Sequence, residues 1–308
     1  MIDQPAWPTQ LLLVDAGNTR LKFKLIRERA VKELRAACGN GEAAPRKQQV
    51  IETILEAESV SFANAELAEA DSSRHLAAVS VLRDFLADQR HLVLVSSVAP
   101  SAVVTLLQRS ASEGNGVVEL ARVKQDAMGV SMRYGAIGTL GVDRWLGMVA
   151  AFQRVEGAVC VVDCGTAITV DFLAADGVHE GGLIAPGFST SLSSLNMADS
   201  LKSAVRVVAL EEAGADLKSS VNRQERLGLS SAKCIFHGVD RMTVAFLDSI
   251  FSQVEFAKPP CQLLITGGGW PALAYAPLVN YRYVQELVFE GLVHAWVAGH
   301  TEPFPQKP

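Results

Sequence analysis

The sequence of 308 residues lacks the features of several large classes of protein. Lysine and arginine number 28 against 33 aspartates and glutamates, and the formal net charge of −5 provides no basic surface for a nucleic acid. No segment approaches the roughly 20 consecutive apolar residues of a membrane span. The first residues lack the basic start and apolar core of a signal peptide. We therefore expect a cytoplasmic protein that binds neither nucleic acid nor a membrane.

Cysteine is scarce, and its spacing predicts neither a cross-link nor a metal site. The five cysteines are odd in number, form no CxxC pair and have no histidine at the spacing that zinc requires. Cys160 and Cys164 lie four positions apart in a β-branched run, so we expect both to face the core from one side of a strand. The six histidines form no metal or triad pattern, which favours structural or surface roles. The serine run from Ser189 to Ser194 has no nucleophile-elbow context, and we interpret it as helix capping.

Two common nucleotide-binding signatures are also missing. No GxGxxG follows an early strand, and no GxxxxGK[ST] occurs anywhere in the chain, so the dinucleotide-binding and P-loop folds are excluded. What is present is the composition of a well-packed protein, with 49% hydrophobic and 20% charged residues. The length is sufficient for two ordinary domains.

Short apolar strand patterns alternate with helical patterns, which predicts an α/β sheet. The expected strands are residues 11–14, 21–25, 91–98, 117–120, 158–162, 168–173 and 262–266. The expected helices are 101–110, 142–152, 230–251 and 285–298, with a loop and one or two surface helices between Cys38 and Glu69. A glycine-studded loop at 129–141 precedes the helix at 142–152 and suggests a site.

Two similar strand-turn-strand patterns open the two halves of the chain. The first turn is Asp15-Ala16-Gly17-Asn18-Thr19, and the second is Asp163-Cys164-Gly165-Thr166-Ala167. Such a turn presents backbone N–H groups and a threonine hydroxyl to phosphate oxygens, while its aspartate can hold a hydrated cation. Either turn alone is more often a simple hairpin. Together, at the heads of two α/β halves, they can bind a triphosphate from both sides.

Two further patterns are ambiguous on their own. The run Gly267-Gly268-Gly269 lets a backbone approach a flat ring or a phosphate closely, but a flexible strand-to-helix connection explains it equally well. Asp143 could take a proton from an alcohol during phosphoryl transfer. From composition alone, however, Asp143 and Arg144 are more simply a carboxylate at a helix start beside a surface ion pair.

In this order, the first turn, the motif Gly141-Val142-Asp143-Arg144 and the second turn resemble the motifs of the type III pantothenate kinases, and the resemblance extends from Leu11 to about Ala298. It implies an α/β fold of two ribonuclease-H-like domains of the acetate and sugar kinase, Hsp70 and actin superfamily. We place these actin-like ATPase domains at residues 1–140 and 141–308, each with one phosphate loop. The implied reaction is ATP-dependent phosphorylation of pantothenate to 4′-phosphopantothenate, the first step of coenzyme A biosynthesis, in a homodimer.

The resemblance also implies roles for individual residues. Asp143 corresponds to the general base, Asp163 to a ligand of a monovalent cation (K⁺ or NH₄⁺), and Asp15 to the carboxylate that holds Mg²⁺ through water. The residues implied in ATP binding are Asp15, Ala16, Gly17, Asn18, Thr19, Arg20, Leu21, Lys22 and Thr166. Those implied in pantothenate binding are Tyr134, Gly141, Val142, Asp143, Arg144 and Ser231.

The sequence departs from the family mainly on the acceptor side. Ser231 stands where the family usually has threonine, and residues 135–140 lack the proline and the acidic or amide residue that usually follow the tyrosine. The segment from Cys38 to Arg74 is longer than in compact members. Two alternatives therefore stay open: a kinase for another small hydroxy compound, and a nucleotide-binding regulatory protein without turnover.

Overall fold

The computed structural model describes residues 7–39, 44–56, 59–63, 91–98, 117–213, 227–255, 260–270, 279–299 and 301–303. The chain forms two compact units: Met1–Arg154 together with Glu286–Pro308, and Val155–Gln285. The expected helix at 101–110 lies outside the described residues. The functional domains proposed at 1–140 and 141–308 stay a prediction.

The first unit contains a six-stranded sheet of order β13-β5-β4-β1-β2-β3. Strands β1 and β2 pair antiparallel, as do β2 and β3, whereas β4 runs parallel to β1 and β5 parallel to β4. Leu11, Leu12, Leu13 and Val14 are all buried, because the central strand β1 is covered on both faces. The bounds are β1 Gln10–Ala16, β2 Arg20–Ile26, β3 Val60–Ala63, β4 His91–Ser97, β5 Val117–Ala121 and β13 Thr301–Pro303.

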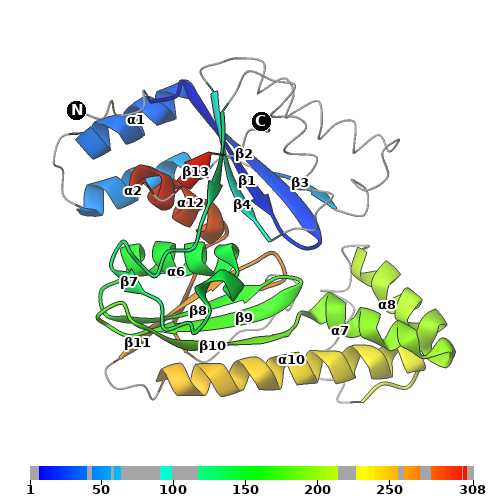
Figure 1. Cartoon of the computed structure of the whole chain (residues 1–308). Coiled ribbons are helices and arrows are strands. Elements are labelled where there is room, and N and C mark those ends of the chain that lie inside the picture. The colour runs from blue at the N-terminus through cyan, green and yellow to red at the C-terminus, as the bar shows by residue number, and fades with distance from the viewer. Residues whose placement is uncertain are drawn as a thin grey trace. The chain divides into compact units, whose positions relative to one another are not determined.

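The described residues of this unit include the helices α1 Glu28–Gly39, α2 Ala44–Ile54, α6 Val142–Arg154 and α12 Leu287–Val297 (Figure 1). Helices α6 and α12 approach so closely that a Cβ atom at Gly291 would overlap the backbone carbonyl of Leu146. Trp145 and Leu287 are fully buried between neighbouring elements. The last helix of the chain therefore completes the core of the first unit.

The structure corrects the expectation for the segment after β2. The first helix begins at Glu28, so Cys38 lies in the last turn of α1 rather than in a loop, and the short strand β3 follows α2. The buried face of α1 consists of Val31, Leu34 and Ala37. These three residues form a narrow apolar stripe in a helix that is otherwise rich in charged residues. A weak stripe of this kind is easily missed in the sequence.

The second unit contains a five-stranded sheet of order β10-β9-β8-β11-β12. Strands β8, β9 and β10 pair antiparallel in succession, and β11 and β12 continue the sheet in parallel pairs. This is the order and direction found for β3-β2-β1-β4-β5 in the first unit, which confirms an α/β fold built on two ribonuclease-H-like sheets. The bounds are β8 Ala158–Cys164, β9 Ala167–Leu173, β10 His179–Pro186, β11 Cys261–Thr266 and β12 Tyr281–Tyr283.

Helix α10 (Ser231–Glu255) runs along one face of this sheet (Figure 1). Its residues Leu247 and Phe251 pack on a core that includes Cys160 and Cys164, so the expectation of two buried core cysteines is confirmed. Burial, together with a smaller effect of the Asp163 carboxylate, raises the pKa of the Cys164 thiol to about 12. Other helical elements in the described part of this unit are α7 Phe188–Ser194, η2 Leu195–Met197, η3 Asp199–Leu201 and α8 Lys202–Ala213.

The serine run was expected to cap a helix, and this is wrong. Residues 189–194 form the body of α7, whose N-cap is Gly187 with no side-chain hydrogen bond. Within the described parts of the chain, none of the helices combines the length and hydrophobicity needed to cross a lipid bilayer.

Candidate active site

The turn between β1 and β2 is the first of the two that the sequence predicts to bind phosphate, and it is named the first phosphate turn for that expectation. The backbone N–H of Gly17 donates to the carbonyl of Arg20 (3.0 Å), which closes a four-residue turn. Asn18, Thr19 and Arg20 are exposed at its tip. Leu21, in contrast, is completely buried, so any part it takes in binding ATP must come from its backbone.

Asp143 lies in the first turn of α6, where the helix dipole favours a carboxylate. Its Oδ1 atom accepts a hydrogen bond from the backbone N–H of Arg144 (2.7 Å). A Cβ atom at Gly141 would come within 2.5 Å of the same Oδ1 atom. Glycine at 141 therefore leaves the space that the carboxylate occupies, and the side chain of Val142 beside it is buried.

Val98 connects the first turn to the Asp143 motif. Its backbone N–H donates to the carbonyl of Ala16 at the end of β1 (3.0 Å). Its Cγ1 atom lies 3.7 Å from the position that a Cβ atom would take at Gly141. Since β1 and β4 are parallel, both features lie at the carboxyl ends of these strands, where α/β sheets commonly bind ligands.

Tyr134 contacts Arg144 in the same unit. An Nη1 atom of Arg144 donates to the Tyr134 hydroxyl (3.3 Å), and the guanidinium carbon lies 5.9 Å from the centre of the Tyr134 ring. The two contacts hold the plane of the guanidinium group. Through Val98 the structure thus links Ala16, at the first turn, to Gly141, and it places Tyr134 in contact with Arg144.

The second phosphate turn joins β8 to β9 in the second unit. The backbone N–H of Gly165 donates to the carbonyl of Ala167 (3.0 Å), and Gly165 and Thr166 are exposed. Asp163 pairs in register with Thr169 on β9 and Thr266 on β11. The second turn therefore repeats the short, glycine-bearing connection of the first.

Two other segments pack directly against the second turn. Gly267 has a positive φ of 91°, and a Cβ atom there would overlap Asp163 Oδ1 and the Cys164 carbonyl. The N–H of Gly269 donates to the same Cys164 carbonyl (2.8 Å). Gly267 and Gly269 are thus needed for a close approach, while Gly268 is exposed, with open space around its Cβ position.

The residues from Gly187 to Thr190, which follow β10 and begin α7, also contact the second turn. The sequence did not predict this contact. The Gly187 N–H (2.9 Å) and the Thr190 hydroxyl (2.6 Å) both donate to the Thr166 carbonyl. A Cβ atom at Gly187 would overlap the carbonyls of Gly165 and Thr166. The available signal was the glycine at the end of β10, which resembles the glycine that follows β11.

Ser231 begins helix α10 in the second unit and is exposed. The preceding Ser230 caps the helix, because its hydroxyl accepts from the Lys233 N–H (3.3 Å) and its carbonyl from the Cys234 N–H (2.8 Å). A Cβ atom at Gly228 would overlap the first turn of the helix. Ser231, which is expected to bind pantothenate, therefore lies at a well-defined helix start and not in the second turn.

No cluster of three or more His, Cys, Asp or Glu side chains suited to a metal ion occurs among the described residues. The expected cation ligands, Asp15 and Asp163, are carboxylates, and Mg²⁺ in phosphate sites uses only one or two carboxylates together with water and phosphate oxygens. The chemistry of these two side chains is therefore compatible with the expected cations.

A buried polar network anchors the other end of α6. Arg154 binds both carboxylate oxygens of Glu290 (Nη2–Oε2 2.6 Å) and also Glu52 (2.9 Å). Gln48 donates to Glu290 (2.7 Å) and lies 2.9 Å from Nε2 of His294. Burial raises the pKa of Glu290 against the lowering effect of Arg154, and burial lowers the pKa of His294 to about 3.

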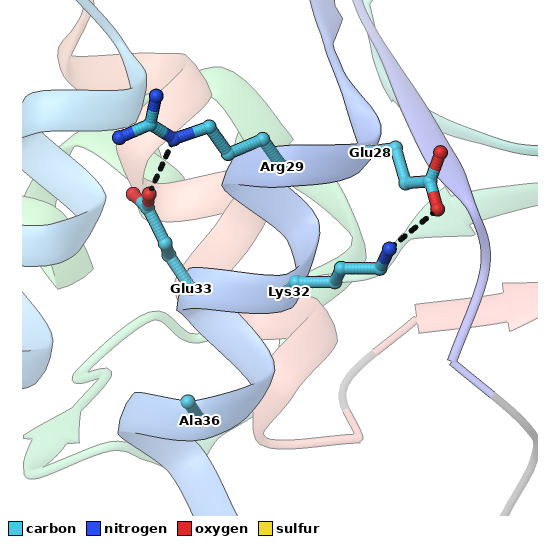
Figure 2. A pocket seen from close by; sticks show the side chains of 5 residues that line it. All are labelled: Glu28, Arg29, Lys32, Glu33 and Ala36. Carbon is cyan, nitrogen blue, oxygen red and sulfur yellow. Dashed lines mark hydrogen bonds and ion pairs between the residues drawn. The ribbon is translucent and has the colours of Figure 1, made fainter.

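One surface hollow of the described residues lies away from these groups. It is a shallow depression of about 460 Å³ along α1, lined by residues 28, 29, 32, 33 and 36 of that helix. Figure 2 shows two ion pairs across it, Lys32 with Glu28 (2.7 Å) and Arg29 with Glu33 (3.0 Å). Such exposed pairs are of little energetic weight.

Comparison with known proteins identifies the family. The model of the family "Type III pantothenate kinase" matches residues 11–253. The chain belongs to this family. The type III pantothenate kinase of Chromohalobacter salexigens is 35% identical over 205 residues, which cover 65% of this chain and 68% of that one. That of Nitrosococcus oceani is 32% identical over 211 residues (67% and 74%), and that of Marinobacter nauticus is 29% identical over 290 residues (94% and 99%).

Proposed function

We propose that the chain transfers the γ-phosphate of ATP to the hydroxyl group of pantothenate, and so forms 4′-phosphopantothenate in the first step of coenzyme A biosynthesis. The observation that carries this proposal is the link through Val98 between the first phosphate turn and Gly141, next to Asp143, in a chain of the type III pantothenate kinase family. A phosphate-binding turn and a carboxylate at one end of a sheet are the parts that phosphoryl transfer requires.

On the nucleotide side, the exposed tips of the two turns supply hydrogen-bond donors. The backbone N–H groups near Asn18 and Thr19, the Thr19 hydroxyl and the Lys22 ammonium would bind phosphate oxygens from the first turn. Gly165 and Thr166 would do so from the second. Asp15 would hold Mg²⁺ through water, and Asp163 would hold a monovalent cation. These cations would neutralise charge that develops on the transferred group.

On the acceptor side, Asp143 would act as the general base. As the pantothenate oxygen bonds to the γ-phosphorus and the bond from that phosphorus to the ADP oxygen breaks, the hydroxyl proton passes to the Asp143 carboxylate. The hydrogen bond from the Arg144 N–H to Oδ1 (2.7 Å) holds the carboxylate in place for this transfer. Gly141 leaves room for it.

Arg144 would bind the carboxylate of pantothenate. A guanidinium group forms two parallel hydrogen bonds to a carboxylate, and the contact with Tyr134 (3.3 Å) orients that group. Ser231 replaces the usual threonine and retains the hydroxyl. We further propose that the active form is a homodimer in the cytoplasm, as expected for the family.

The deciding experiment is a coupled assay of ADP release with ATP and pantothenate, with and without potassium. Replacing Asp143→Asn should leave ATP affinity nearly unchanged and reduce kcat by about 100-fold or more, because the amide cannot accept the proton. Asp176→Asn, in the exposed turn after β9, is the matched control and should retain full activity. An unaltered rate in Asp143→Asn would remove this residue from the mechanism.

One observation favours a second candidate, a kinase for another small hydroxy compound. Residues 135–140 lack the proline and the acidic or amide residue usual in the family, so the acceptor pocket differs there. An acceptor screen that includes hexoses separates the two candidates. Turnover of a hexose without turnover of pantothenate would establish the second and overturn the first.

A further inference from the structure

A small hairpin precedes the acceptor residues and was not expected from the sequence. Strands β6 (Asp126–Ala127) and β7 (Val130–Ser131) pair antiparallel around Met128 and Gly129. Both turn residues have positive φ, 52° and 79°, which is the geometry of a two-residue hairpin turn. For Met128 this conformation is unfavourable, so contacts elsewhere must hold the turn.

Those contacts come from the last turns of α6. The Gln153 side chain donates to the Met128 carbonyl (2.8 Å). A Cβ atom at Gly129 would lie 2.9 Å from the Phe152 ring, so the turn packs on this ring as closely as a glycine permits. The hairpin is therefore bound to the end of the helix that is remote from Asp143.

The same segment then returns to the first turn of α6, where Tyr134 contacts Arg144. Arg144 and Gln153 are separated along the helix by roughly 13 Å, at 1.5 Å per residue. Six residues from Met128 to Tyr134 can span at most about 20 Å, so the segment has to cover about two thirds of its full reach. Val130 and Met132, which are buried, hold the segment between the two ends. The position of the hairpin on α6 thus limits where Tyr134 can meet Arg144.

We propose that Gly129 is a positioning residue for acceptor binding, and that the docked hairpin sets the orientation of Arg144 through Tyr134. This rests on the proposed function, in which Arg144 binds the acceptor carboxylate. In this role Gly129 acts on the acceptor only through Phe152 and the segment that leads to Tyr134. Its role is to let the hairpin pack on Phe152. The length of α6 then sets the distance between this packing site and the Tyr134–Arg144 contact.

Steady-state kinetics of Gly129→Ala tests the proposal. The methyl group meets Phe152 and strains the positive φ, so the hairpin must shift along or away from α6. We expect KM for pantothenate to rise by about tenfold, while kcat and KM for ATP change by less than about twofold to threefold. A merely structural defect would instead lower the amount of active enzyme, and so lower kcat with both KM values unchanged.

Two further variants separate the contact from general strain. In the double variant Gly129→Ala/Phe152→Ala the ring is removed, and KM for pantothenate should return toward the wild-type value, below that of Gly129→Ala alone. Gly299→Ala is the control, since Gly299 also has a positive φ (73°) but has no atom within 4 Å of its Cβ position. Its KM for pantothenate should be unchanged.

A measurement that needs no turnover tests the role of Gly129 without depending on which acceptor the enzyme uses. Amide hydrogen exchange of the ligand-free protein should become faster in residues 132–141 of Gly129→Ala and stay unchanged in β1 and β8. Wild-type protein that does not phosphorylate pantothenate would refute the proposed function alone. Unchanged exchange in residues 132–141, or an unchanged KM for pantothenate in an active enzyme, would overturn the role of Gly129.

Discussion

The Oδ1 atom of Asp143 lies 2.5 Å from the point that a Cβ atom would occupy at Gly141, two residues earlier. The carboxylate therefore lies over the backbone that leads into α6. It fits there only because residue 141 has no side chain. This relationship makes the glycine of the Gly-Val-Asp-Arg motif a part of the site. It also gives the first prediction.

Gly141→Ala should lower kcat by roughly 10- to 100-fold, because the added methyl group displaces the carboxylate that accepts the proton. ATP affinity, measured by calorimetry, should change little, since the first turn is untouched. Gly138→Ala is the control within the same segment, because its Cβ position has no atom within 4 Å. Equal activities of the two variants would contradict the role given to Gly141.

Gly267→Ala and Gly268→Ala should differ sharply. A methyl group at 267 would overlap Asp163 Oδ1 and requires a φ of 91°, whereas one at 268 meets open space. We expect Gly267→Ala to raise KM for ATP by about tenfold or more and to raise the potassium concentration needed for half-maximal activity. Gly268→Ala should match the wild type in both titrations. Similar values for both variants would show that the packing of this turn on Asp163 does not matter for binding.

Arg154→Ala should destabilise the protein strongly, because Glu290 is 1% exposed and would be left as a buried carboxylate without its cation. The expected loss is about 3 kcal/mol in the free energy of unfolding, from urea titration. Lys32→Ala removes an exposed ion pair with Glu28 and should cost less than about 0.5 kcal/mol. Comparable losses in the two variants would mean that the Arg154 network contributes no more than a surface pair.

The pH dependence of stability should carry the signature of His294. Burial lowers its pKa in the folded protein to about 3, from 6.5. Between these values the unfolded chain binds the extra proton, so this histidine's contribution is complete above pH 6.5 and is lost as the pH falls toward 3. Burial raises the pKa of Glu290 above its ordinary value of 4.5, so above that value the folded protein keeps the extra proton and this group's contribution to stability falls as the pH rises.

Urea titrations of wild type and His294→Gln between pH 8 and pH 5 measure this effect. The wild type should lose up to about 1.4 kcal/mol per pH unit more than the variant over the acidic part of this range. Parallel curves for the two proteins would show that His294 does not titrate differently on folding.

The local pattern of apolar residues was enough to predict the strands and the helix in which this pattern is clearest. The buried run at Leu11 to Val14, its counterpart at 158–162 and the long helix α10 were confirmed with small changes at their ends. Both turns lie between the predicted strands. Their glycines and threonines can be read in the sequence, so this part of the candidate site could be predicted from the sequence alone.

The remainder depends on contacts between distant segments. The glycine that follows β10 can be seen in the sequence, but its packing on Thr166 cannot, and Gly129 acquires its role only through Phe152 on another element. The strands β6 and β7 have two residues each, too short for a periodic pattern. Strand β3 is likewise a short strand at the end of its sheet. Such features follow from tertiary packing, which no single stretch of sequence encodes.

The placement of α12 in the first unit has a consequence for synthesis on the ribosome. The second unit is one uninterrupted stretch, Val155–Gln285, and all of its residues are made before those of α12. The first unit has to wait, because Leu146 and Gly147 on α6 stay without the helix of residues 287–297 that packs on them. Although domains generally fold in the order of their synthesis, here the unit whose first strands are made earlier is the one that is completed last.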